Sequence, residues 1–72
     1  MKIVLGIKGM MCPMCESHVN KVINDHFDVK KVTSNRKKDQ TVIVTNEDIS
    51  DEEIKSVIKE TGYELVSIER EE

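Results

Sequence analysis

The sequence predicts an α+β domain in which two helices cover one face of a four-stranded antiparallel sheet. Three observations lead to this fold class. The chain has only 72 residues, which is enough for one domain. Segments with apolar residues at every second position alternate with segments of helical periodicity, in the order strand, helix, strand, strand, helix, strand. Hydrophobic residues make up 38% of the chain but aromatic residues only 3%, so the core must be aliphatic.

The composition is that of a soluble, globular chain and excludes several classes of partner. Charged residues make up 35% of the sequence and the net charge is −3. This acidic balance argues against nucleic acid as a partner, because phosphate binding requires a basic surface. The apolar run Ile3–Leu5 is too short for a signal peptide or a membrane span. We therefore expect a cytoplasmic protein without membrane insertion.

The chain begins with a predicted strand that is followed by a helix. The strand is Lys2–Lys8, because its apolar residues alternate. The helix runs from Pro13 to about His26 or Phe27, since proline is favoured at the first helical position, and Cys12 is then its N-cap. The apolar stripe of this helix consists of Cys15, Val19, Val22, Ile23 and His26.

A β-hairpin is predicted next. Val29 and Val32 mark its first strand, although Ser34 stands where the alternation requires an apolar residue. The second strand is Gln40–Thr45, and two of its β-branched residues are predicted to face the core, Val42 and Val44. The intervening polar turn carries three basic residues, Arg36, Lys37 and Lys38. We expect this tip to be solvated and remote from the cysteines.

A second helix and a last strand complete the chain. Ser50–Glu53 is a capping box, and the helix that it opens has the apolar stripe Ile54, Val57, Ile58 and Thr61. Gly62 follows as a left-handed residue that ends the helix. In the last strand, Tyr63–Glu69, the apolar residues change parity between Leu65 and Val66, which indicates a bulge. The order βαββαβ is that of the ferredoxin-like sandwich.

Two cysteines at the start of the first helix are the candidate functional residues. Cys12 and Cys15 lie three positions apart, where a disulfide closes only a very small loop. In a reducing compartment such a pair binds metal or performs redox chemistry. A helix N-terminus stabilises thiolates. Copper(I) is soft and accepts two thiolates, whereas structural zinc requires four ligands and the chain has no second cysteine pair.

Redox chemistry is the main alternative from a different class. The segment Cys12–Cys15 (CPMC) also resembles the motif of thioredoxin-like oxidoreductases. Those enzymes carry a cis-proline downstream of the motif, but Pro13 is the only proline in this chain. Metal binding is therefore favoured over thiol–disulfide exchange.

The segment Gly9–Cys15 (GMMCPMC) resembles GMxCxxC, the motif of the heavy-metal-associated domain family, which includes copper chaperones and the metal-binding domains of copper P-type ATPases. The resemblance spans nearly the whole chain, as a single domain of residues 1–72. It implies a non-enzymatic protein that binds one Cu(I) through Cys12 and Cys15. The ion would pass by thiolate exchange to a copper P-type ATPase, a repressor or a related metal-binding domain. A mercury or zinc carrier and an excised ATPase domain remain alternatives.

Three further residues are expected to support the metal-binding loop. As the resemblance suggests, Met10 is expected to point inward and hold the loop to the core. Lys8 can offset part of the negative charge of a site with two thiolates and one Cu(I). Tyr63 is expected either to pack on the fold or to cover the metal loop.

The remaining soft or basic side chains are expected to be bystanders. His18, one helical turn after Cys15, is expected to be solvated, and His26 to favour the helix C-terminus or the core edge. Met11 and Met14 are expected to be exposed beside the site. We expect a monomer, with a metal-bridged dimer as an alternative.

Overall fold

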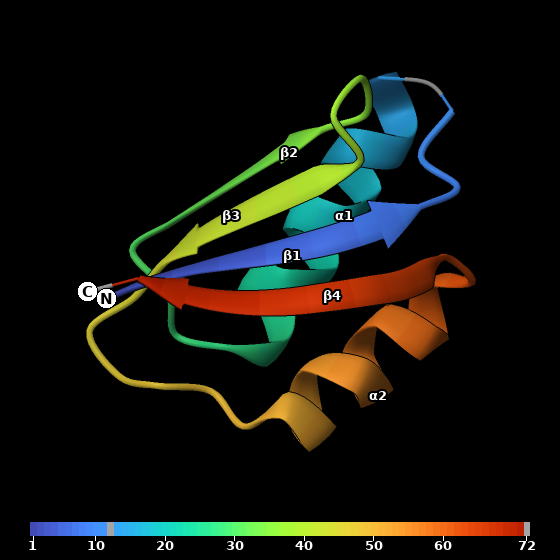
Figure 1. Cartoon of the computed structure of the whole chain (residues 1–72). Coiled ribbons are helices and arrows are strands. Elements are labelled where there is room, and N and C mark those ends of the chain that lie inside the picture. The colour runs from blue at the N-terminus through green and yellow to red at the C-terminus, as the bar shows by residue number, and fades with distance from the viewer. Residues whose placement is uncertain (12, 72) are drawn as a thin grey trace.

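The computed structural model describes residues 1–11 and 13–71. Within them it contains β1 (Lys2–Lys8), α1 (Pro13–His26), β2 (Lys31–Asn35), β3 (Gln40–Val44), α2 (Asp51–Thr61) and β4 (Glu64–Glu71). The strands form one antiparallel sheet in the order β2-β3-β1-β4. Both helices cover the same face of that sheet (Figure 1). The predicted ferredoxin-like sandwich is confirmed. Neither helix of the described residues has the length and apolar character that a membrane span requires.

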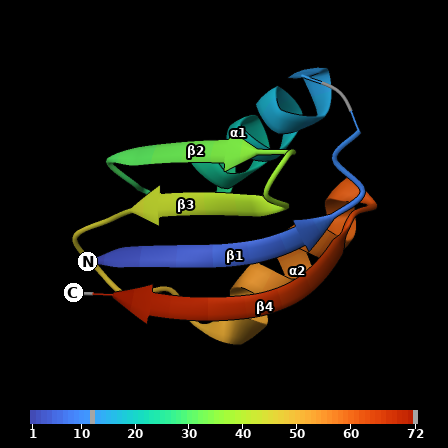
Figure 2. The ribbon, with the colours of Figure 1, turned by 45° about the horizontal axis from the view of Figure 1, so that its top comes forward.

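The connections between elements gather at two opposite ends of the molecule. Successive elements run up and down the sheet, so every second connection falls at the same end. The β1–α1 connection, the β2–β3 turn and the α2–β4 connection lie together, while the start of β1 and the end of β4 lie at the opposite end (Figures 1 and 2). We call the first of these the loop end. The cysteine segment therefore shares its end of the molecule with the hairpin turn.

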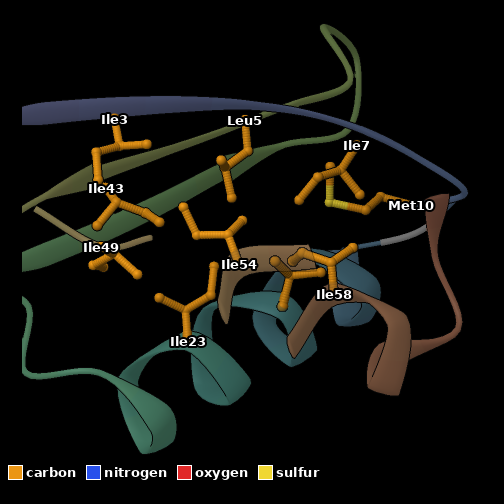
Figure 3. Close-up of a cluster of buried hydrophobic side chains, with 10 residues drawn as sticks. Ile3, Leu5, Ile7, Met10, Ile23, Ile43, Ile49, Ile54 and Ile58 are labelled. Carbon is orange, nitrogen blue, oxygen red and sulfur yellow. The ribbon is translucent and has the colours of Figure 1, made fainter. Parts of the chain in front are cut away.

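The core lies between the sheet and the two helices and is mainly aliphatic (Figure 3). The predicted inward residues of β1 are completely buried, and α2 begins and ends as predicted. The Ser50 hydroxyl accepts a hydrogen bond from the Glu53 N–H at 3.2 Å, and Gly62 has a φ of 86°. The buried hydrophobic residues are Ile3, Leu5, Ile7, Met10, Val19, Ile23, Ile43, Ile49, Ile54, Val57 and Ile58.

The prediction for β3 is wrong about which side faces the core. Ile43 pairs with Ile3 across the β1–β3 ladder, so both point toward the helices. The threonines on either side of Ile43 are buried with it, because their hydroxyls have partners inside the protein: Thr41 at 3.0 Å from the Ser34 hydroxyl, and Thr45 at 3.0 Å from the Glu47 carbonyl. The residues predicted to face inward lie half-buried on the outer surface of the sheet, Val42 and Val44.

The predicted bulge in β4 is confirmed. Gly6 of β1 pairs with Ser67, and the next residue, Ile7, pairs with Leu65. Val66 is therefore the extra residue, and it is 54% exposed. The bulge allows the apolar residues on either side of it to point toward the helices despite their unequal spacing.

Strand boundaries differ from the prediction in β2, β3 and β4, and β3 ends at Val44, one residue before its predicted end. Val29 precedes β2 and packs against the core from the connecting segment. β4 begins one residue after Tyr63 and extends to Glu71, because Lys2 at the start of β1 provides a pairing partner there. Pairing across the sheet, which residue spacing does not reveal, decides these boundaries.

Candidate metal-binding site

The first turn of α1 carries the part of the cysteine motif that the structure describes. Cys15 is the third residue of α1, is half-buried and packs against the hydrophobic core. Cys12, predicted as the N-cap, lies outside the described residues. The first backbone N–H groups of a helix lack partners within it and carry partial positive charge. Cys15 therefore lies at an end of the helix where negative charge is generally stabilised.

Met10 holds the loop before α1 to the core, as predicted. Its side chain is only 4% exposed and extends beneath the sheet beside Ile7 (Figure 3). Met11 and Met14 are 85% and 80% exposed, which confirms that they face solvent next to the cysteine motif. The Met10 thioether therefore packs in the core, while the thioethers of Met11 and Met14 lie at the surface.

Tyr63 lies against the start of the same loop. A Cβ atom on Gly9 would be 3.1 Å from Tyr63 Cδ1, and Gly9 has a φ of 107°, so this position favours glycine on both counts. The Tyr63 ring also meets the His18 ring edge to face, with the centroids 6.1 Å apart. His18 is exposed, as predicted, and so is Lys8 at the end of β1. Tyr63 therefore joins the loop, α1 and the α2–β4 connection.

The predicted remoteness of the basic hairpin tip is wrong. The Arg36 N–H donates a hydrogen bond to Glu16 Oε2 at 2.7 Å, and Arg36 Nε lies 4.0 Å from Glu16 Oε1. Glu16 directly follows Cys15, so the tip touches the first turn of α1. The βαββαβ order places the hairpin turn and the start of α1 at the loop end (Figure 2). Glu16 has no signal in the sequence beyond being an acid in a first helical turn, where acids are common.

His26 does not belong to the site or to the buried stripe of α1. It is the last residue of α1, and its side chain is 45% exposed. Its Nε2 atom lies 3.2 Å from a carboxylate oxygen of Glu60 in α2. His26 therefore links the exposed surfaces of the two helices rather than filling the core edge.

Soft sulfur atoms lie at the start of α1, in the half-buried Cys15 and the exposed Met14. Among the described residues, no group of three or more His, Cys, Asp and Glu side chains could hold a metal ion. A pair of thiolates is a soft donor set of the kind that Cu(I) accepts, and Cys15 is the thiol of the motif that the structure describes. Zinc prefers four ligands from sulfur, nitrogen and oxygen.

Comparisons with known proteins identify the family of this chain. The model of the heavy-metal-associated domain family matches residues 4–64, whereas a comparison with curated protein sequences found no match. The fold is similar to that of the CopZ metallochaperone, with 24% identity, 92% of this chain and 100% of that chain covered, and a TM-score of 0.82. It is also similar to a copper-binding domain from HMA7, a P-type ATPase, with 25% identity, coverage of 96% and 97%, and a TM-score of 0.78.

A third similar structure comes from a zinc-loaded protein. The N-terminal domain of ZntA in its Zn(II) form is 22% identical, with 90% of this chain and 88% of that chain covered and a TM-score of 0.79. The three structures share the βαββαβ sandwich, and the family model spans most of the chain. This protein belongs to the heavy-metal-associated domain family, whose members bind heavy metals.

Proposed function

We propose that this protein is a copper(I) carrier that holds one ion between the thiolates of Cys12 and Cys15. It passes the ion by ligand exchange to the metal-binding domain of a copper P-type ATPase or to a copper-responsive repressor. The observation that carries the proposal is the place of Cys15, in the first turn of α1, against the core and at the loop end. Family membership and the likeness to a metallochaperone and a copper-binding domain support it.

The charge balance of this donor set suits a transient carrier. Two thiolates and one Cu(I) leave one net negative charge, which the N-terminus of α1 and the exposed Lys8 partly offset. A two-coordinate ion leaves a third position open. A partner's thiolate can bond to copper there, after which one Cu–S bond to this chain breaks. A second partner thiolate then replaces the remaining bond in the same way, and each thiolate released from this chain takes a proton from water. No free copper is released in this exchange.

Zinc is the second candidate cargo, because the ZntA domain of similar fold is a zinc form. Its preference for four ligands is the argument against it. The sulfur pair would leave two positions to water, to the exposed His18 or to a partner. We therefore rank copper first, and place the protein in the cytoplasm, where a reducing environment keeps closely spaced thiols reduced.

The test is an anaerobic titration with Cu(I) in the presence of a competing chelator. We expect the wild-type chain to hold one copper per molecule, and Cys12→Ser and Cys15→Ser to lose it, because a hydroxyl is a poor ligand for a soft ion. Met14→Leu is the matched control: it removes an exposed thioether of the same segment and should leave copper binding unchanged. Retention of copper by either serine variant, or failure of the wild type to bind it, would refute the proposal.

A further inference from the structure

We propose that Glu16 is a positioning residue for the metal-binding turn. It belongs to a polar seam between α1 and the β2–β3 hairpin, which we infer fixes the direction in which Cys15 points. The seam consists of Glu16, Asn20, Ser34, Arg36 and Thr41. The inference rests on the proposed function for its consequence, the affinity for metal, but its structural content can be tested without metal.

The first contact of the seam joins Glu16 to a rigid part of the hairpin. The donor at 2.7 Å is the backbone N–H of Arg36, so this bond does not depend on where the long arginine side chain lies. Asn35 fixes the turn, because its Oδ1 accepts the N–H groups of Lys37 and Lys38 at 3.0 and 3.2 Å. The Glu16 side chain is only 25% exposed, which strengthens the bond relative to one in water.

The second contact lies one helical turn further along α1. The Ser34 hydroxyl donates to Asn20 Oδ1 at 2.6 Å and lies 3.0 Å from the Thr41 hydroxyl. A serine hydroxyl has one hydrogen, which is given to Asn20, so Thr41 is the donor to Ser34. This chain of hydrogen bonds satisfies the completely buried Thr41. It also explains why Ser34 stands at an inward position that a strand usually gives to an apolar residue.

Two hydrogen-bonded contacts on one side of α1 restrict its rotation about its own axis. Apolar packing is not directional, whereas hydrogen bonds weaken steeply when they are misaligned. Glu16 and Asn20 are four residues apart and share a face of the helix. Successive side chains of an α-helix are about 100° apart, so fixing Glu16 also fixes the direction of Cys15.

A carboxylate beside a thiolate could instead act through its charge, and one substitution separates the two roles. Glu16→Gln keeps an oxygen that accepts the Arg36 N–H but removes the charge. Glu16→Ala removes both. If Glu16 positions the turn, glutamine restores most of what alanine loses. If it acts by charge, glutamine and alanine have the same effect.

The first experiment compares Cu(I) affinity by chelator competition in folded protein. We expect Glu16→Ala to weaken binding by about tenfold and Glu16→Gln by less than about threefold. The matched control is Asp25→Ala, which removes an exposed ion pair with Lys21 on the same helix and should bind as the wild type does. Equal affinities of Glu16→Ala and the wild type, or of the alanine and glutamine variants, would overturn the inference.

The second experiment uses the metal-free protein, so it remains informative if the wild type holds no copper and the proposed function fails. Its readout is amide hydrogen exchange at Val19 and Asn20, whose N–H groups donate helical hydrogen bonds to the carbonyls of Cys15 and Glu16. Exchange there should be about tenfold faster in Glu16→Ala and unchanged in Glu16→Gln and Asp25→Ala. Ser34→Ala breaks the second contact and should also accelerate amide exchange at these two residues. This variant tests the inference if Glu16→Ala does not fold. Unchanged exchange in Ser34→Ala and in any folded Glu16→Ala would contradict the inference.

Discussion

Met10 and Met11 are neighbours in the chain with opposite physical roles, since one is 4% and the other 85% exposed. The motif resemblance correctly assigns Met10, because it carries information about which side chain supports the loop, and Met11 is exposed as expected. Residue patterns alone assign less. They place His26 in the buried stripe, although it lies at the exposed end of α1, and they do not single out Glu16 at all. The partner of Glu16 is twenty residues away, so only the folded chain reveals the contact.

At this scale we predict that Met10→Ala destabilises the fold by about 2–5 kcal/mol, because it removes a buried side chain and leaves a cavity. Thermal or denaturant unfolding of the metal-free protein measures this free energy. Met11→Ala, one position along, should change stability by less than about 0.5 kcal/mol, because surface substitutions rarely do more. Equal destabilisation by the two variants would show that Met10 does not hold the loop to the core.

The elements themselves follow from local signals wherever those signals are strong. The Ser50 cap, the left-handed Gly62 and the β4 bulge are all visible in the sequence and are confirmed. The side of β3 that faces the core is not visible in the sequence, because counting apolar residues favours the side with two valines over the side with one isoleucine. Pairing of Ile43 with Ile3 reverses that choice, and hydroxyl groups with partners make threonine acceptable inside.

Two glycines that flank elements at the loop end give an element-scale prediction. Gly62 has a φ of 86°, and no atom beyond its two chain neighbours lies within 4 Å of the place that a Cβ would take, so Gly62→Ala meets only the backbone penalty of about 1–2 kcal/mol. Gly9 has a φ of 107°, and its Cβ would also press on Tyr63 at 3.1 Å. We therefore expect Gly9→Ala to destabilise the protein more than Gly62→Ala in denaturant unfolding.

A third variant isolates the contact with the ring. In a Tyr63→Ala background the ring is absent, and the costs of the two glycine substitutions should become similar. If Gly9→Ala costs no more than Gly62→Ala in the wild-type background, the approach of Tyr63 to the loop is not tight.

Over the whole molecule, the end opposite the cysteine motif is closed by one arginine. Arg70 of β4 donates from Nε to Asp48 Oδ1 at 2.8 Å, from Nη2 to the Ile49 carbonyl at 2.8 Å, and from Nη2 to Asp51. It thereby joins the last strand to the β3–α2 connection and to the start of α2. The sandwich is predictable because two amphipathic helices need one sheet face to cover. The contacts of Arg70 are not predictable from the sequence, because Arg70 lies in a charged segment without periodicity.

The Arg70 contacts predict a specific dependence of stability on pH. The hydrogen bond from Arg70 lowers the pKa of Asp48 from its ordinary value of 3.8. A carboxyl whose pKa is lower in the folded state stabilises the fold above its unfolded pKa, and this contribution disappears as the pH falls through the folded value. Melting temperatures of the wild type and Arg70→Met should therefore differ most at about pH 7 and less at about pH 2 to 3. Part of the difference should persist in acid, because the bond to the Ile49 carbonyl does not titrate.

Lys21→Met, which removes the exposed pair with Asp25, is the control and should lower the melting temperature little at any pH. A difference between wild type and Arg70→Met that stays constant across this range would mean that Asp48 gains nothing from Arg70 on folding.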